Sequence, residues 1–341
     1  MRLAIRSFTA LAVLASAPVA LPASTSAQAV QVDSSIPEYK VVQGVSGSIK
    51  SVGSDTMINL MTNWAESFKK LYPSITVEIE GKGSGTAPTA LIAGTANFGP
   101  MSRLMKDQEL DEFSKKFGYK PTPIATSIDM LAVYVHKDNP IASLSLEQID
   151  AIFSKTRKSG AAKDITTWGD LGLTGEWKDK PISLYGRNSA SGTYTYFKEH
   201  ALAKGDYKDS VKEQPGSSGV VQSIASDKFA IGYSGIGYKT ADVRAVPLSK
   251  DAKSPVVEAS PENAYSGKYP LARFLYIYVN LKPGTELDPL RREFLRFVLS
   301  RQGQEDVVKD GYFPLPGRIA ADGLKQAAIT SASATEAGAP R

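Results

Sequence analysis

The chain has 341 residues with 40 Lys and Arg against 35 Asp and Glu, and its formal charge of +5 falls by two, to +3, once the two arginines of the first 29 residues are set aside. So small an excess, with no basic cluster interleaved with aromatic residues, argues against a nucleic acid as partner. The absence of cysteine excludes disulfides, thiol catalysis, thiolate metal sites and a lipid-modified N-terminal cysteine. A hydrophobic content of 42% over this length can bury a sizeable core and favours two domains over one.

Residues 1–29 are expected to be a cleavable secretory signal peptide. Two arginines precede an apolar run over residues 11–21, and an Ala-Gln-Ala sequence ends at Ala29. A membrane anchor is the alternative, but the run is short and Pro18 interrupts it. We therefore expect the mature protein to be periplasmic or secreted.

Residues 30–46 show no sustained pattern and are expected to form a leader onto the folded part. Short apolar strands then alternate with stretches of helical periodicity. In chain order, strands are expected in SIKSVGS, ITVEIEGKGS, NFGPMSRL and IDMLAVYVHKDNP, with helices in DTMINLMTNWAESFKKLYP and GTAPTALIAGTA. ISLYGRNSASGTYTYFKEHAL is a further strand followed by a helix, and SSGVVQSIASDKFAIGYSGIGY repeats the arrangement less strongly. Residues 319–341, rich in Ala, Ser and Thr, are expected to be a flexible tail.

This alternation predicts an α/β fold with much parallel pairing in its sheets. Ligands of such sheets lie beyond the carboxyl ends of the strands, where loops lead into helices. The loops at these strand ends are therefore the places where a binding site is expected.

Three strand-to-helix loops share one pattern, a serine and a threonine two residues apart. A helix N-terminus presents unpaired N–H groups and a partial positive charge, a hydroxyl there can donate a further hydrogen bond, and glycine lets a ligand approach the backbone. Each loop taken alone is more often an ordinary helix cap. Three of them facing one cleft would form a donor-lined pocket for a tetrahedral oxyanion. The residues concerned are Ser54 and Thr56 in GSDTM, Ser84 in GSGTA, and Ser191, Gly192 and Thr193 in ASGTY.

Charged residues near these loops could complete such a pocket. Arg187 lies four residues before Ser191, and its guanidinium could hold two oxygens of an anion. Arg103, which follows Ser102, could add a second positive charge or could be a solvated surface residue.

A site made only of donors suits a fully ionised anion such as sulfate, whereas phosphate near neutral pH keeps a proton that needs an acceptor. Asp55 in the first loop and Asp129 at the start of the buried strand are the two candidates for that acceptor. Each also has an ordinary structural explanation, since Asp55 could serve the helix dipole and Asp129 could pair with an arginine.

In their order and spacing, these motifs resemble those of the phosphate-binding proteins of phosphate ABC transporters, the PstS-like branch of the periplasmic-binding-protein superfamily. The resemblance covers about residues 47–316. It also rests on WGDLGL, FAIGYSGIGY, YPLARFLYIYVN and EFLRFVLSRQGQEDVVKDGYFPLP. In one familiar form of the family the turn after FG ends in Ser-Asp, and that Asp accepts the phosphate proton. This chain has Ser102-Arg103 there, so the acceptor must lie elsewhere, and we favour Asp129 over Asp55.

The resemblance implies two α/β lobes with an anion in the cleft between them, and a permease that receives it. The first lobe would comprise residues 47–131 and 270–318, the second residues 132–269, and the protein would act as a monomer without a cofactor or metal. The ligand-binding positions that match the family are Ser54, Thr56, Ser84, Arg187, Ser191, Gly192 and Thr193.

Other functions remain open at this stage. A secreted phosphatase is one, but His136 and His200 are the only histidines and neither has a suitably spaced second histidine or carboxylate. A binding protein for sulfate, molybdate or arsenate is another, and a structural protein that kept only the fold is a third. The expected function is phosphate binding without catalysis.

Overall fold

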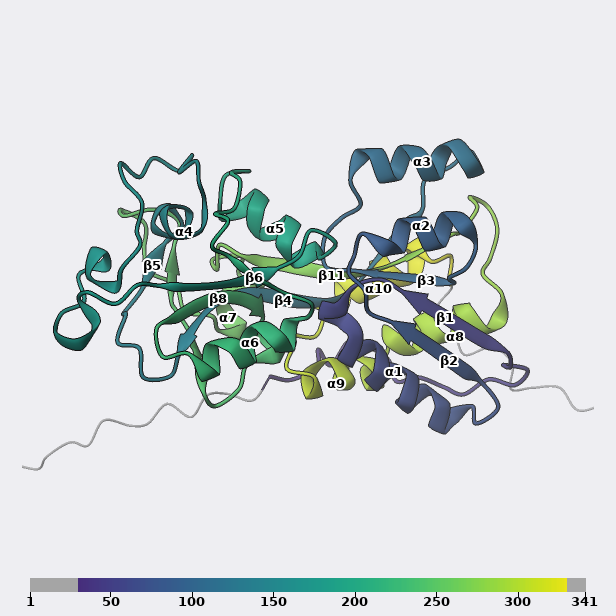
Figure 1. Cartoon of the computed structure of the whole chain (residues 1–341). Helices are drawn as coiled ribbons and strands as arrows, with labels where there is room; N and C mark the ends of the chain where they lie inside the picture. The colour runs from purple at the N-terminus through teal and green to yellow at the C-terminus, as the bar shows by residue number, and fades with distance from the viewer. Residues whose placement is uncertain (1–29, 330–341) are drawn as a thin grey trace, which may run out of the picture.

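The computed structural model describes residues 30–329, which form a long mixed sheet with helices on both faces (Figure 1). The strand order is β2-β1-β3-β11-β4-β8-β6-β7, and β9 pairs with β4. The pairs β1–β2, β1–β3, β6–β7 and β6–β8 are parallel, whereas β11 and β4 pair antiparallel with their neighbours. The strands are β1 (Ser48–Val52), β2 (Thr76–Glu80), β3 (Phe98–Met101), β4 (Thr122–His136), β6 (Ser183–Arg187), β7 (Lys212–Gln214), β8 (Ala230–Gly235), β9 (Val243–Ala245) and β11 (Ala272–Val279), with a separate parallel pair β5 (Leu144–Ser145) and β10 (Leu248–Ser249).

The long strand β4 connects the two halves of the molecule. Its residues 122–130 pair with β11, and from Leu131 onward it pairs with β8. We call the half with β1, β2 and β3 the first lobe and the half with β6, β7 and β8 the second lobe. The expected two-lobed α/β fold is confirmed.

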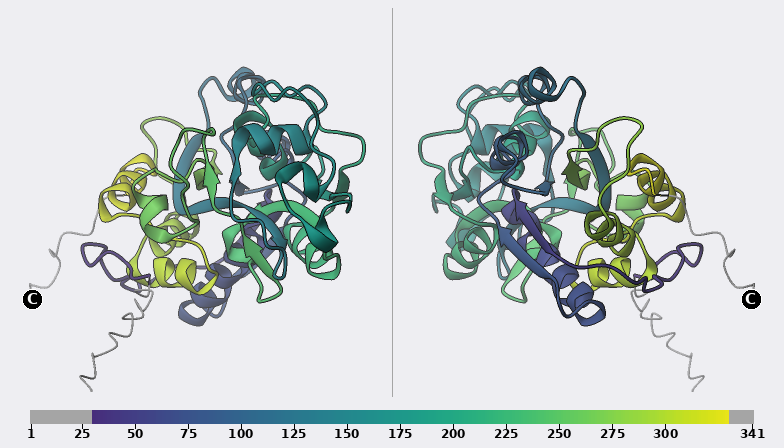
Figure 2. Two further views of the ribbon diagram at one scale, coloured as in Figure 1. Left: turned by 90° about the vertical axis from the view of Figure 1, so that its left-hand side faces the viewer. Right: turned by 90° about the vertical axis from the view of Figure 1, so that its right-hand side faces the viewer.

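Helices cover the sheet of each lobe, and one cluster of buried apolar side chains extends from Trp64 in the first lobe to Trp168 and Phe197 in the second. In the end-on views the yellow C-terminal helices lie on the side opposite the teal α4 and α5 region (Figure 2). Within residues 30–329, none of the helices is both long and apolar enough to cross a membrane. The helices and 3-10 turns are η1 (Asp55–Met57), α1 (Ile58–Leu71), α2 (Thr86–Ala93), α3 (Asp107–Phe117), α4 (Leu146–Phe153), η2 (Trp168–Leu171), η3 (Gly175–Trp177), α5 (Gly192–His200), α6 (Ser217–Ser226), η4 (Ile236–Tyr238), α7 (Pro261–Tyr265), α8 (Pro289–Val298), α9 (Arg301–Lys309) and α10 (Gly317–Gln326).

The expectation of a flexible segment from residue 319 is wrong for residues 319–329, because they contain most of α10 and the packed turn after it. Small residues are what make this packing possible: Gly323 lies against Leu299, where an added Cβ would come within 3.1 Å of a methyl group. The lack of large apolar side chains in this segment therefore lets α10 pack closely against its neighbours and does not indicate disorder here. The expected signal peptide and residues 330–341 lie outside the described residues.

Asp310 ends α9 in a half-buried position against α1. The amide of Asn63 donates a hydrogen bond to it at 3.2 Å, but burial prevails and raises the pKa of Asp310 to about 7. Ionisation of this carboxyl is therefore disfavoured in the folded protein.

Ala320→Asp is expected to lower the free energy of unfolding by about 3 kcal/mol or more, because it places an unpaired charge in the buried face of α10. The matched control is Ala321→Asp on the exposed face of the same helix, which should change stability by less than about 0.5 kcal/mol. Urea unfolding measures both. Equal effects would show that α10 does not pack as described.

Asp310→Asn should stabilise the protein at pH 8 and leave its stability unchanged near pH 4. The ordinary pKa of 3.8 applies to the unfolded chain, so the folded protein is penalised progressively as pH rises from about 4 to about 7 and the penalty is complete above that. After allowance for partial solvent exposure, we expect a gain of roughly 1–2 kcal/mol at pH 8. Thermal unfolding of the variant and of the exposed Asp209→Asn control at both pH values tests this, and a gain at pH 4 as large as at pH 8 would contradict it.

Candidate functional site

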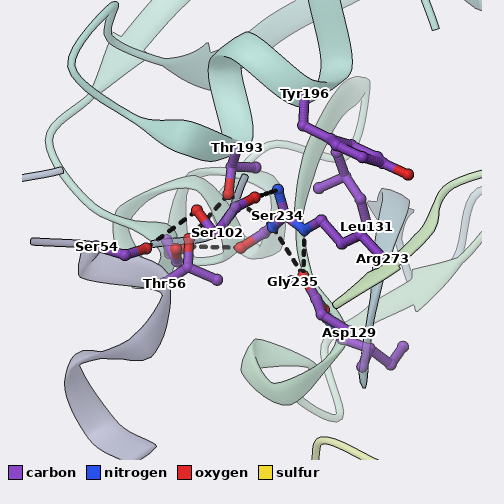
Figure 3. A network of polar contacts seen from close by, with 12 residues as sticks. Ser54, Thr56, Ser102, Asp129, Leu131, Thr193, Tyr196, Ser234, Gly235 and Arg273 are labelled. Carbon is purple, nitrogen blue, oxygen red and sulfur yellow. Dashed lines mark hydrogen bonds and ion pairs between the residues drawn. The ribbon is translucent and has the colours of Figure 1, made fainter. Parts of the chain in front are cut away.

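The loops after β1, β2 and β3 meet the loop after β6 in a cluster of buried hydroxyl groups (Figure 3). Ser102 Oγ lies 3.0 Å from Ser54 Oγ and 3.2 Å from Ser84 Oγ. Thr56 Oγ1 of the first lobe lies 2.8 Å from Thr193 Oγ1 of the second. The structure therefore brings all three predicted loops together at the boundary between the lobes.

Glycines allow this approach. A Cβ on Gly192 would lie 2.3 Å from Ser84 Oγ, and one on Gly83, whose φ is +111°, would lie 2.5 Å from the carbonyl oxygen of Ala190. The N–H of Gly85 donates to that same carbonyl at 3.0 Å. The two loops can touch only because side chains are missing at these positions.

Ser191 caps helix α5, which is the ordinary structural role of a serine in such a loop. Its Oγ accepts hydrogen bonds from the N–H groups of Thr193 (3.1 Å) and Tyr194 (3.3 Å) at the start of α5. Ser54 makes no such cap bond to its 3-10 turn, and Gly85 rather than Ser84 caps α2. The cap interpretation thus holds for one loop of the three.

Hydrogen-bond donors of the protein already occupy the lone pairs of three of these hydroxyls. Ser84 Oγ accepts from the N–H of Ser102 at 3.0 Å, Ser191 Oγ accepts two N–H groups, and Thr193 Oγ1 accepts from Nη2 of Arg273 at 2.9 Å. A hydroxyl whose oxygen accepts in this way keeps its own proton to donate. Three hydroxyls of the cluster can therefore each donate a proton to an oxyanion that enters it.

Arg187, the last residue of β6, is only 1% exposed. It donates from Nη1 to Ser217 Oγ at 2.7 Å, and its Nη2 forms an ion pair of 3.2 Å with Asp55 of the first lobe. Burial lowers the pKa of Arg187, and the Asp55 carboxylate partly offsets this. Within residues 30–329 its Nε has no hydrogen-bond partner. A buried guanidinium with a donor to spare can still bind an anion.

Asp55 links the lobes a second time, because its Oδ2 also accepts the N–H of Ser217 at the start of α6, at 2.8 Å. Tyrosines fix the turn that carries it: Tyr238 of the second lobe donates to the carbonyl of Asp55 at 2.9 Å, and Tyr312 donates to that of Thr56 at 2.8 Å. The turn from Ser54 to Thr56 is thus held by contacts from both lobes.

Asp129 is fully buried and belongs to the same polar network (Figure 3). Its Oδ2 accepts from Nε (2.9 Å) and Nη2 (2.7 Å) of Arg273, and its Oδ1 accepts the N–H of Ile236 at 3.0 Å. Asp129 therefore pairs with an arginine, as its ordinary structural explanation expected, and that arginine is Arg273. Asp129 reaches the hydroxyl cluster through this arginine, whereas Asp55 contacts Arg187 directly.

Sequence reasoning missed Arg273. The available signal was a single arginine inside the apolar strand segment YPLARFLYIYVN, a position where a charge needs a buried partner.

The side chain of Arg103 is paired with Glu109 and makes no hydrogen bond to the hydroxyl cluster within residues 30–329. Its guanidinium makes two bonds of 2.7 Å to Glu109 at the start of α3, and Nη1 also donates to the carbonyl of Leu104. Ser102 lies in the cluster, but Arg103 does not, so an anion contact from Arg103 has no support in this geometry. Within the described residues there is also no group of three or more His, Cys, Asp or Glu that could hold a metal ion.

Comparisons with known proteins agree on one family. A model of the PBP superfamily domain matches residues 39–302. The phosphate-binding protein PstS of Pseudomonas aeruginosa is 57% identical over 295 residues, which are 86% of this chain and 91% of that protein. The protein of the same name from Staphylococcus haemolyticus is 33% identical over 86% and 89% of the two chains.

A similar solved structure is that of a phosphate ABC transporter substrate-binding protein from Clostridium perfringens with bound phosphate. Its TM-score is 0.66 and its sequence identity 27%, and the match covers 79% of this chain and 99% of that one. The chain therefore belongs to the PBP superfamily and, within it, to the PstS family.

Proposed function

We propose that this chain binds inorganic phosphate outside the cytoplasm and delivers it to the permease subunits of a phosphate ABC transporter. One observation carries the proposal: buried hydroxyls of both lobes converge in one cluster, and the buried Arg187 is ion-paired with Asp55, which directly precedes Thr56 of that cluster. Relatives named phosphate-binding protein PstS, and a related structure with bound phosphate, support the choice of anion.

Each lobe supplies one side of the proposed grip. The first lobe, residues 47–131 and 270–318, offers Ser54, Thr56 and Ser84, and the second, residues 132–269, offers Arg187 and the start of α5 from Ser191 to Thr193. The change of partner strand at Leu131 supports this division. Binding proceeds by closure of the lobes around the anion, which buries it between donors of opposite sides.

The site binds rather than catalyses. Within residues 30–329 the rings of His136 and His200 hydrogen-bond only to their own segments: Nδ1 of His136 accepts from the N–H of Asp138, and Nδ1 of His200 lies 3.0 Å from the carbonyl of Tyr196. Neither is poised to transfer a proton to a group held by the hydroxyl cluster. The monomer is the working unit, because both halves of the grip come from one chain.

The acceptor of the phosphate proton is one of two carboxylates. Asp129 is fully buried and fixed in the network that includes Thr193, and within residues 30–329 its Oδ1 accepts one hydrogen bond, from the N–H of Ile236. Asp55 contacts Arg187 directly and is partly exposed. We propose Asp129 as the acceptor, since a desolvated, fixed carboxylate discriminates between protonated and unprotonated anions more strongly.

Arg187→Ala should weaken phosphate binding by about 3 kcal/mol or more, at least 100-fold in Kd, because it removes the buried charge that faces the anion. Isothermal calorimetry on the purified mature protein measures this. Arg244→Ala is the control, because that arginine donates to backbone carbonyls of Asn139 and Ile141 in another part of the second lobe and should leave the Kd unchanged. An unchanged Kd for Arg187→Ala would remove this arginine from the site, and hydrolysis of a phosphate ester by the wild type would contradict a binding role.

Asp129→Asn should weaken phosphate binding more than sulfate binding, because only phosphate carries a proton that needs an acceptor. Asp55→Asn serves as the comparison, and both variants are titrated with each anion. If Asp55→Asn alone changes the ratio of the two affinities, the acceptor is Asp55. Equal losses of affinity for both anions in both variants would mean that neither carboxylate accepts the phosphate proton.

A further inference from the structure

We infer that Arg273 is a positioning residue for anion binding: it fixes the hydroxyl of Thr193 as a donor, and it does so across the boundary between the lobes. The inference rests on the proposed phosphate binding and extends it to a residue that need not touch the anion. It starts from the position of Arg273 in the sheet.

Arg273 is the second residue of β11 and is paired in register with Asp129 of β4. The pair lies two residues before β4 leaves β11 for β8, at the strand that both lobes share. Antiparallel register thus places the guanidinium and its counter-charge together at the crossing point between the lobes.

The guanidinium reaches three separate elements from this position. Nε and Nη2 bind Asp129, Nη1 donates to the carbonyl of Ser102 at 2.7 Å, and Nη2 also donates to Thr193 Oγ1 at 2.9 Å. The ring of Tyr196, one turn along α5 from Thr193, lies 5.1 Å from its central carbon. The contacts to Ser102 and Thr193 connect a first-lobe loop to the first turn of a second-lobe helix.

The contact to Thr193 determines where the hydroxyl proton of Thr193 points. Oγ1 accepts from Arg273 with one lone pair, so its own proton is free to donate to an anion that enters between the two threonines, in place of the 2.8 Å contact with Thr56 Oγ1 in which either oxygen can be the donor. Without Arg273 the hydroxyl could turn and present its oxygen instead, which would repel an anion.

Only arginine can make all these contacts. Its planar fork offers five N–H groups in fixed directions, whereas the ammonium of lysine is a single point that cannot reach Asp129, Ser102 and Thr193 together.

The contacts of Arg273 to both Ser102 and Thr193 also exist only when the lobes are closed, since these two residues belong to opposite lobes. Arg273 should therefore slow release of the anion and have little effect on its entry.

A double-mutant cycle tests this coupling. Phosphate affinity is measured by calorimetry for the wild type, Arg273→Lys, Thr193→Val and the double variant, with Arg244→Lys as a matched control away from the site. Lysine keeps a charge beside Asp129, so the fold should survive, and thermal unfolding verifies it. We expect Arg273→Lys to weaken binding about 10-fold or more when Thr193 is present and less than about 3-fold in the Thr193→Val background.

Equal fold losses in the two backgrounds would overturn the inference, because a merely structural arginine acts independently of the hydroxyl. Stopped-flow kinetics give a second readout: the loss should be in the dissociation rate, with association within about 2-fold. A loss confined to association would also overturn it. If the wild type itself fails to bind phosphate, the proposed function is wrong, an outcome that differs from either result of the cycle.

Discussion

The ion pair between Asp129 and Arg273 lies where β4 changes from one partner strand to another, and the geometry of the site depends on it. A charge in so buried a place is costly unless it is paired and fully hydrogen-bonded, and replacement of such pairs by apolar residues often stabilises proteins. Stability alone therefore gives little reason for this pair. The pair instead fixes the position of the guanidinium, because the arginine that neutralises Asp129 also donates to the carbonyl of Ser102 and to Thr193 Oγ1.

A second constraint concerns the direction of hydrogen bonds. Hydroxyl groups can donate or accept, so a cluster of serines and threonines has no fixed electrostatic sign of its own. Backbone N–H groups and one guanidinium remove this ambiguity by occupying the oxygens of Ser84, Ser191 and Thr193. In the proposed site the cap at Ser191 has two roles, because the serine oxygen that accepts the first N–H groups of α5 keeps its own proton to donate.

Much of this arrangement could be predicted from the sequence, since alternating periodicities indicate the α/β fold and a repeated Ser-x-Thr pattern marks the loops. The failures have physical causes. The role of Arg273 depends on its pairing with Asp129, which lies 144 residues away in the sequence. The strand register that brings the two together cannot be derived from a single sequence. Arg103 follows Ser102 in the chain, but Glu109 determines where its side chain points. Small residues in α10 indicate close packing and disorder equally well.

Affinity at such a site is a difference between two sets of hydrogen bonds. The lobes already bind one another through Thr56 and Thr193, through Arg187 and Asp55, and through Tyr238 and the backbone of the first loop. An anion that enters between the threonines exchanges one neutral bond for charged ones, which are roughly twice as strong. The contacts to Asp55 and the loop backbone do not have to be broken in that exchange. In the proposed closure the lobes would come together along a boundary that is already complementary, and the anion would supply the remaining preference for the closed form.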